Sequence, residues 1–359
     1  MLIFDAHLDL AWNALSWDRD LTISLAASRE AERTMTDHPA RGRGTVTLPE
    51  MRRGDVGLCL ATLLSRARPG QVALKGRTRR ELDHRNQHLA CADARGQLGY
   101  YRLLEELGEI SLITSSRSLD QHLASWQQGD HSRIGVIVAM EGADPIVSPA
   151  QADQWFADGL RCVGLAHYGR SAYAVGTGDA GPLTPAGVEL LRQFDRLGMI
   201  VDLTHSSDPS FFQAIDTFGG PVFASHNNCR FLVPGDRQYS DEQIKLLIRR
   251  GGVIGVACDA WMLTPNYQRA VTPRDAVTLN HVAEQIDHIC QLAGNRDHAA
   301  IGSDLDGGFG TEQVPADLDS IADLQKLIPI LHSRGYTDPD IAAIFHGNWL
   351  RFFRQSLPN

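Results

Sequence analysis

The sequence predicts an α/β fold, a closed (β/α)8 barrel of the TIM type. Short apolar segments recur along the whole chain, and most are apolar at consecutive rather than alternate positions. This pattern is typical of parallel strands that are buried on both faces. Helix-like segments lie between many of them, and such alternation predicts a parallel sheet covered by helices. The expected strands are residues 2–9, 56–64, 110–114, 134–142, 160–167, 198–205, 221–226, 251–259 and 299–308.

The intervening segments carry helix start and stop signals. In the segment 184–198, Thr184 is a suitable N-cap, Pro185 occupies the first helical position and Gly198 suits the C-terminal end. Two further segments open with Ser-Asp and close with two glycines. The expected helices are residues 79–108, 184–198, 207–220, 240–252, 320–335 and 338–353.

The alternation continues without a composition shift or a linker, so we expect one domain over residues 1–359. The least regular stretch, near residues 18–50, is expected to be a loop or insertion with short helix. An open, doubly wound sheet is the alternative architecture. Such sheets usually carry a glycine-rich turn after the first strand, whereas here that turn reads DAHLDLAW.

Composition excludes several classes of protein. The net charge of −9 argues against a nucleic-acid partner, which normally requires a basic face. No apolar run reaches the length of a membrane span, and no signal peptide or lipid anchor is evident. The six cysteines form no CxxC pair, which favours a reducing compartment. We therefore expect a cytoplasmic protein that is not associated with membranes.

Histidine and acidic residues lie at the ends of the expected strands. In a barrel the carboxyl ends of all strands meet at one face, where active sites lie. Buried charges are costly unless they are paired or bind a metal, so packing alone does not explain this set. The residues are His7, Asp9, Glu141, His167, His205, His226, Asp304 and Asp306.

These residue types predict a metal site. Imidazole nitrogens suit zinc and similar ions, and a carboxylate can bind one ion or bridge two. His7 and Asp9 lie two residues apart on the first expected strand and therefore point the same way. Two histidines and a bridging carboxylate complete a second site, and two neighbouring ions can ionise a water molecule between them.

The chain resembles the membrane dipeptidase (renal dipeptidase-like) family of zinc peptidases, peptidase family M19, in its bacterial form. The resemblance rests on segments that occur in order along nearly the whole chain. They are DAHLDL, AMEG, LRCVGLAH, VDLTHSS, ASHNNCR, DRQYSDEQIKLLIRRGGVIGV, IGSDLDGG and GNWLRFF. The resemblance implies an amidohydrolase-like barrel, two zinc ions per chain and hydrolysis of dipeptides by a metal-bridged hydroxide.

The resemblance also implies the metal ligands of this chain. His7 and Asp9 correspond to the ligands of one zinc ion, and His205 and His226 to those of the other. Glu141 corresponds to the carboxylate that bridges both.

Three further residues receive roles toward the substrate from the same resemblance. His167 would stabilise the oxyanion, Arg237 would bind the substrate carboxylate, and Asp304 would contact the substrate amine and transfer protons. Opposite charges at Asp304 and Arg237 suit an enzyme that recognises both ends of a dipeptide. The resemblance implies L-Xaa-D-Xaa as well as L-Xaa-L-Xaa dipeptides as substrates. A homodimer is a family-level expectation.

The sequence departs from the family pattern at Tyr168, where many relatives have asparagine, and at Asp259 and Trp261 in the region that lines the substrate pocket. These departures leave the side-chain preference open. Manganese or cobalt could replace zinc. Two other functions remain: a related metal-dependent hydrolase of a lactam, lactone or cyclic amide, and a non-enzymatic barrel that has lost its metal. The His-x-Asp opening and the glutamate bridge favour the dipeptidase.

Overall fold

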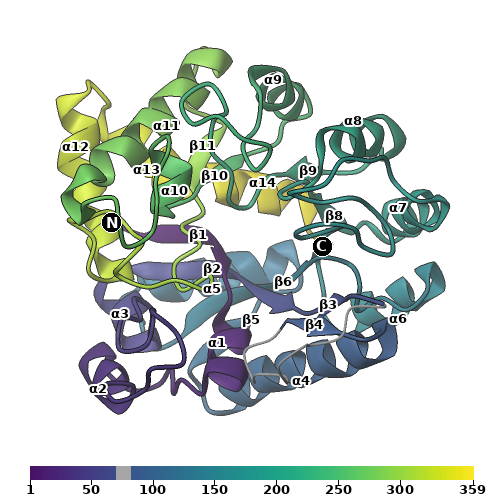
Figure 1. Cartoon of the computed structure of the whole chain (residues 1–359), viewed down its shortest axis with the longest axis horizontal. Coiled ribbons are helices and arrows are strands. Elements are labelled where there is room, and N and C mark those ends of the chain that lie inside the picture. The colour runs from purple at the N-terminus through teal and green to yellow at the C-terminus, as the bar shows by residue number, and fades with distance from the viewer. Residues whose placement is uncertain (70–81) are drawn as a thin grey trace.

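Parallel strands form the centre of the molecule in the computed structural model, which describes residues 1–69 and 82–359. Neighbours pair in the order β1-β2-β6-β7-β8-β9 and β10-β11, and the bridge between Ala224 and Ile254 links β9 to β10. β11 lies beside β1, so the sheet curls round on itself (Figure 1). The strands are β1 (Ile3–Leu8), β2 (Val56–Leu64), β6 (Ile134–Glu141), β7 (Cys162–Gly164), β8 (Ile200–Asp202), β9 (Val222–Phe223), β10 (Ile254–Val256) and β11 (Ala299–Ile301).

This curled parallel sheet with helices around it confirms the predicted TIM-type fold class over the open sheet. The expected strand at 110–114 also exists, as β5 (Ile110–Leu112). It pairs with the first half of β6, whereas β7 pairs with the second half. Strand β5 therefore lies at the rim of the barrel and contributes nothing to the end where the predicted site lies.

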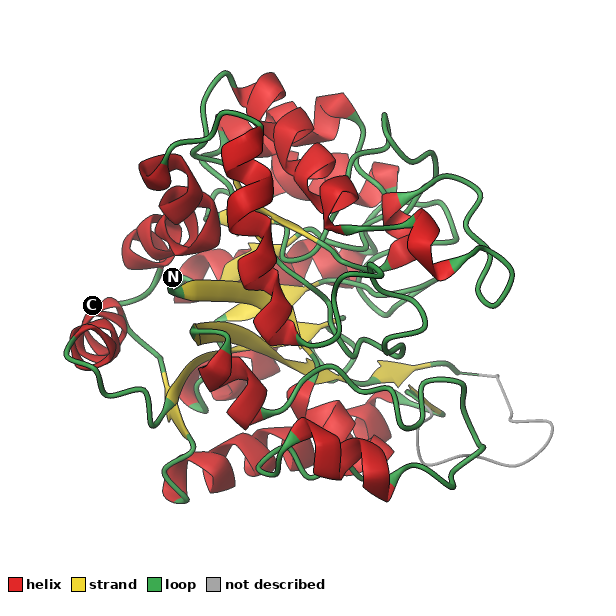
Figure 2. Cartoon of the chain, turned by 90° about the vertical axis from the view of Figure 1, so that its left-hand side faces the viewer, coloured by secondary structure: helices red, strands yellow, loops and turns green. Residues whose placement is uncertain are grey.

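Helices surround the sheet (Figure 2). The α-helices are α1 (Leu10–Trp17), α2 (Leu25–Ala31), α3 (Leu48–Arg53), α4 (Gln87–Glu106), α5 (Ser116–Gln127), α6 (Ala152–Ala157), α7 (Pro185–Leu197), α8 (Asp208–Thr217), α9 (Asp241–Arg249), α10 (Ala260–Leu263), α11 (Leu279–Ala293), α12 (Leu327–Ser333), α13 (Asp338–Ala342) and α14 (Asn348–Ser356). Short 3-10 helices are η1 (Pro149–Gln151), η2 (Arg274–Ala276) and η3 (Ile321–Lys326), and η4 (Ala343–Gly347) is a π-helical turn. None of the described helices is both long and apolar enough to cross a membrane.

The capping signals of α7 are confirmed. The Thr184 side chain accepts a hydrogen bond from the Gly187 N–H, and Pro185 is the first helical residue. Gly198 ends the helix with φ of +68°, a left-handed conformation that glycine adopts without steric cost.

Three predicted helices differ clearly in extent, and the one expected at 338–353 consists of α13, η4 and α14 and ends at Ser356. Residues 79–81 of the helix expected at 79–108 lie outside the described residues, and α4 begins only at Gln87 because β4 (Asp83–His84) pairs with β3 (Arg66–Ala67). The helix expected at 320–335 is divided into η3 and α12. Pro329 lies in the first turn of α12, where its missing N–H breaks no helical hydrogen bond.

Aromatic side chains fill the amino-terminal end of the barrel. Trp349 of α14 is fully buried, and its ring packs against Phe4 of β1 and Phe223 of β9. The indole N–H donates to the Ile301 carbonyl over 2.9 Å. The last helix therefore closes the end of the barrel opposite to the candidate site.

We expect Trp349→Ala to lower the free energy of unfolding by about 3–5 kcal/mol, because it removes a fully buried ring and leaves a cavity. Urea denaturation followed by circular dichroism measures this loss. Phe231→Ala is the control, because that side chain is 72% exposed and its removal should change stability little. Equal effects of the two substitutions would contradict the structural role of Trp349.

Candidate metal centre

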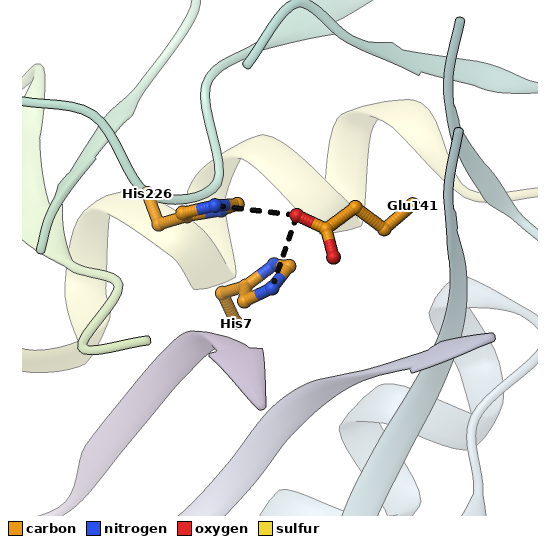
Figure 3. Close-up of side chains that lie close together, drawn as sticks. All are labelled: His7, Glu141 and His226. Atoms are coloured by element: carbon orange, nitrogen blue, oxygen red, sulfur yellow. Dashed lines mark ion pairs between the residues drawn. The ribbon is translucent and has the colours of Figure 1, made fainter. Parts of the chain in front are cut away.

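Glu141 is the last residue of β6, and its carboxylate lies at the centre of the candidate site. Its Oε1 atom is 3.6 Å from His7 Nε2 and 3.4 Å from His226 Nε2. Figure 3 shows both imidazole rings beside this oxygen. The same oxygen lies 3.3 Å from His205 Nε2. Three histidines, one within β1 and two after β8 and β9, therefore converge on one carboxylate oxygen at the end of β6.

His7 lies within β1, but Asp9 does not. Asp9 is the N-cap residue of α1, one residue beyond the strand, so the expectation that both lie on one strand is wrong. The Asp9 carboxylate makes no capping hydrogen bond and accepts one from the Thr62 hydroxyl instead. Its Oδ1 atom still lies 3.6 Å from His7 Nε2, so the structure brings the pair together.

His205 and His226 lie in the turns after β8 and β9, because these strands end earlier than the sequence suggested. Their Nε2 atoms are 3.2 Å apart. His205 has φ of +64°, and Asp304, after β11, has φ of +58°. Such left-handed backbone in non-glycine residues costs free energy, and it is concentrated at functional sites.

Hydroxyl groups orient these imidazole rings. Thr177 Oγ1 lies 3.0 Å from His205 Nδ1, and Ser225 Oγ lies 2.8 Å from His226 Nδ1. Because the Nδ1 atoms are engaged, the Nε2 atoms face the site. Such partners fix the tautomer of a metal-binding histidine.

The donor set fits metal ions. His7 Nε2 is buried and has no hydrogen-bond partner among the described residues, although a buried polar atom normally requires one. Two donors on one tetrahedral zinc ion lie about 3.4 Å apart, given zinc–nitrogen distances near 2.1 Å. The Nε2 and Oε1 distances around Glu141 match this spacing. Three overlapping groups could hold an ion: His7, Glu141 and His226; Glu141, His167 and His205; and His7, Asp9 and Asp304.

Burial keeps the histidines neutral, which is the form that binds metals. It lowers the pKa of His7 to about 3, and the charge of Arg237 acts in the same direction. Burial also lowers the pKa values of His205 and His226 well below their usual range.

Burial has the opposite effect on the acids. It raises the pKa of Glu141 well above its usual range, and the charges of Asp9 and Asp304 add to this effect. It raises the pKa of Asp9 to about 6, although the Thr62 hydroxyl opposes the shift. Crowded buried carboxylates of this kind are stabilised in their ionised form by a bound cation.

The residues predicted to contact the substrate line one cavity with the candidate ligands. His167 Nε2 lies 3.8 Å from Glu141 Oε1, and Asp304 Oδ1 lies 3.8 Å from His7 Nε2. The Arg237 guanidinium donates to Asn227 Oδ1 over 2.7 Å and to the His226 carbonyl over 2.8 Å. The cavity is lined by Asp9, Glu141, His167, His205, His226, Arg237 and Asp304, among others.

Asp306 does not join the site. Its carboxylate accepts hydrogen bonds from the Thr45 N–H over 2.8 Å and from the Val46 N–H over 3.0 Å. Arg19 Nη1 lies 3.6 Å from it. Asp306 therefore links the 18–50 segment, which contains α2, to the turn after β11 through hydrogen bonds and an ion pair.

Tyr168, Asp259 and Trp261 line the cavity, so the predicted position of Asp259 and Trp261 at the pocket is confirmed. Sequence reasoning missed the supporting hydroxyls of Thr62, Thr177 and Ser225. It also missed cavity residues such as Trp12, Leu64, Leu82 and Met262. Only Ser225, directly before His226, offered a signal in the sequence.

Comparison with known families agrees with this geometry. The family model described as membrane dipeptidase (peptidase family M19) matches residues 1–357. The chain belongs to this family. Its members are hydrolases, and the resemblance inferred from the sequence motifs is thereby confirmed.

Similar proteins are known from bacteria and fungi. An uncharacterized protein encoded in the pqqA 5′ region of Klebsiella pneumoniae is 33% identical over 181 residues, which are 50% of this chain and 63% of that protein. Dipeptidase verJ from Clonostachys rogersoniana is 29% identical over 231 residues, 63% of this chain and 56% of that protein. The chain thus spans less than two thirds of the length of these relatives.

Solved structures share the fold. The dipeptidase AC, a metallopeptidase of family M19, has a TM-score of 0.80 at 22% identity, with coverage of 100% of this chain and 99% of that one. A metallopeptidase from Rhodobacter sphaeroides, liganded with a phosphinate mimic of L-Ala-D-Ala, has a TM-score of 0.78 at 21% identity, with coverage of 99% of both chains.

Proposed function

We propose that this protein is a binuclear zinc dipeptidase. One observation carries the proposal: a single buried oxygen, Glu141 Oε1, lies 3.3–3.6 Å from the Nε2 atoms of three histidines that lie in or after different strands. A carboxylate in this position can bridge two ions. We assign His7 and Asp9 to one zinc ion, His205 and His226 to the other, and Glu141 to both.

Two bound ions supply the activation of a water molecule and the polarisation of the peptide carbonyl. Residues of the chain supply the remaining functions. His167 faces the same site and donates a hydrogen bond to the developing oxyanion. Asp304 carries a proton between the attacking water and the leaving amine.

The charges of the cavity support recognition of a small zwitterion. Arg237 presents a guanidinium, whose fork geometry suits a substrate carboxylate. Its five N–H donors exceed the two bonds to Asn227 and His226, so donors remain for the substrate. Asp304, in the same cavity, pairs with the substrate ammonium group.

We propose L-Xaa-D-Xaa and L-Xaa-L-Xaa dipeptides as substrates. The L-Ala-D-Ala mimic bound by the Rhodobacter sphaeroides metallopeptidase supports the first class. A lactam, lactone or cyclic amide is the second candidate, since the same metal chemistry serves it. Opposite charges at Arg237 and Asp304 favour the dipeptide, because a cyclic amide lacks both charged ends.

Hydrolysis of L-Ala-D-Ala, L-Ala-L-Ala and N-acetyl-L-Ala-D-Ala by the zinc-loaded protein tests this proposal, with chiral chromatography of the products. We expect free alanine from at least one free dipeptide and none from the acetylated one. If neither dipeptide is cleaved while two zinc ions are bound, the dipeptidase proposal fails and the lactam or lactone class takes its place.

Arg237→Ala should raise KM for a free dipeptide by about 10–100-fold, because one charge-assisted interaction is lost. Metal content should be unchanged, since Arg237 is not a ligand. The control is the C-terminally amidated dipeptide, which lacks the carboxylate. If the substitution impairs hydrolysis of the amide as much as that of the free dipeptide, Arg237 does not bind the carboxylate.

Zinc as the native metal, a cytoplasmic location and a possible homodimer stay predictions from the sequence. Metal analysis of the purified protein and its mass in solution test the first and the last of these.

A further inference from the structure

Arg66, at the start of β3, lies directly behind His167. Its Nη1 atom is 3.3 Å from His167 Nδ1. We propose that Arg66 is a positioning residue that holds His167 as a neutral Nε2–H donor toward the reaction site and excludes it from metal coordination. This inference rests on the proposed function, in which His167 stabilises the oxyanion.

The chemistry of the two groups determines the tautomer. A guanidinium has only donors, so the ring nitrogen that faces it must accept a hydrogen bond. His167 Nδ1 therefore carries the lone pair, and in a neutral ring the proton then resides on Nε2. That atom lies 3.8 Å from Glu141 Oε1 and points into the site.

The neighbouring histidines have partners of a different kind. The Nδ1 atoms of His205 and His226 face hydroxyl oxygens, which can accept a hydrogen bond. The Thr177 hydroxyl also donates to the His205 carbonyl over 3.4 Å, so its lone pairs remain for the imidazole. In these rings the Nδ1 atom can carry the proton, which leaves Nε2 free to bind a metal ion.

This difference determines whether His167 is a metal ligand or a hydrogen-bond donor. Glu141, His167 and His205 lie close enough together to hold an ion. A protonated Nε2 cannot coordinate a metal ion, however, so Arg66 makes His167 unsuitable as a ligand. The same proton makes it a hydrogen-bond donor, which is what a developing oxyanion requires.

Arg66 is held in place from several directions. Its Nε atom donates to Asp83 Oδ1 over 2.7 Å, and its backbone N–H donates to the Leu82 carbonyl over 2.9 Å. The next residue, Ala67, donates to Asp144 Oδ2 over 2.9 Å. The side chain is only 17% exposed, so the guanidinium is fixed against His167 rather than extended into solvent.

The first test is the tautomer of His167 in the zinc-loaded protein, measured by long-range proton–nitrogen NMR with 15N-labelled histidine. His167→Gln identifies the signals by their loss. We expect a protonated Nε2 and an unprotonated Nδ1. The opposite tautomer would overturn the proposal, and this measurement requires no activity and no variant of Arg66.

The second test compares Arg66→Met with Arg66→Lys. Arg66→Met should redistribute the His167 tautomers and lower kcat by about 100-fold, with KM and zinc content unchanged. Arg66→Lys should restore part of the rate, because an ammonium group also only donates. The matched control is Arg52→Met, which removes an arginine paired with Glu109 over 2.6 Å at 24% exposure, away from the site.

Unchanged kcat and an unchanged tautomer in Arg66→Met would contradict the role of Arg66. If the wild-type protein cleaves no dipeptide, the proposed function fails, but the tautomer of His167 still decides the inference about Arg66.

Discussion

Glu141→Gln is expected to lower kcat/KM for a dipeptide by about 1,000-fold or more and to reduce the zinc content. The amide is nearly isosteric, but it loses the charge that serves both ions. Metal stabilisation of the reaction amounts to several kcal/mol, and each 1.36 kcal/mol is a factor of ten in rate. Steady-state kinetics and elemental analysis of the same preparation measure the two effects.

Glu109→Gln is the matched control, because Glu109 is also ion-paired but lies away from the site. Glu109→Gln should retain the wild-type kcat/KM and the wild-type zinc content. Retention of full metal content and full activity by Glu141→Gln would show that the bridging assignment is wrong.

Thermal unfolding of the metal-free protein shows whether Glu141→Gln loses activity because a metal ligand is missing or because the fold is destabilised. Burial raises the pKa of Glu141 in the folded state, so the ionised carboxylate destabilises the metal-free protein. This destabilisation is absent below the unfolded-state pKa and grows as pH rises toward the folded-state value. At neutral pH, the melting temperature of metal-free Glu141→Gln should therefore be no lower than that of the metal-free wild type.

Asp304→Asn should lower kcat by about 100- to 10,000-fold, the usual contribution of a general acid–base group, and leave zinc content nearly unchanged. The backbone tolerates this substitution. Asp304 has φ of +58°, and asparagine adopts that left-handed conformation as readily as aspartate does. Kinetics and elemental analysis again provide the measurement.

Asp55→Asn is a suitable control for Asp304→Asn. Asp55 also has positive φ, +55°, but its half-exposed side chain pairs with the amino terminus of the chain. Its substitution should not affect kcat. If kcat of Asp304→Asn is within twofold of the wild-type value, Asp304 does not transfer the proton.

The fold class could be predicted because parallel strands buried on both faces leave continuous apolar runs. The lengths of β7 to β11 could not be predicted, since apolar character continues beyond the last ladder hydrogen bond. The predicted strand at 198–205 is one example. Strand pairing stops at Asp202, and His205 has a left-handed backbone conformation. The position where a strand ends depends on where adjacent strands diverge, and a single sequence does not predict this.

The candidate ligands could be predicted because each follows an apolar run and carries a metal-binding group. Asp306 shows the limit of that reasoning. It has the same chemistry and nearly the same position as Asp304, yet it faces Thr45, a contact between residues 261 positions apart. The partners Thr62, Thr177 and Arg66 lie outside the quoted motifs, because only the folded barrel brings them against the site.

Anomalous diffraction at the zinc edge from crystals of the zinc-loaded protein tests the central claim most directly. We predict two peaks, one beside His7 and Asp9 and the other beside His205 and His226, with Glu141 in contact with both. A single peak, or a peak coordinated by His167 Nε2, would contradict the binuclear centre and the assigned roles.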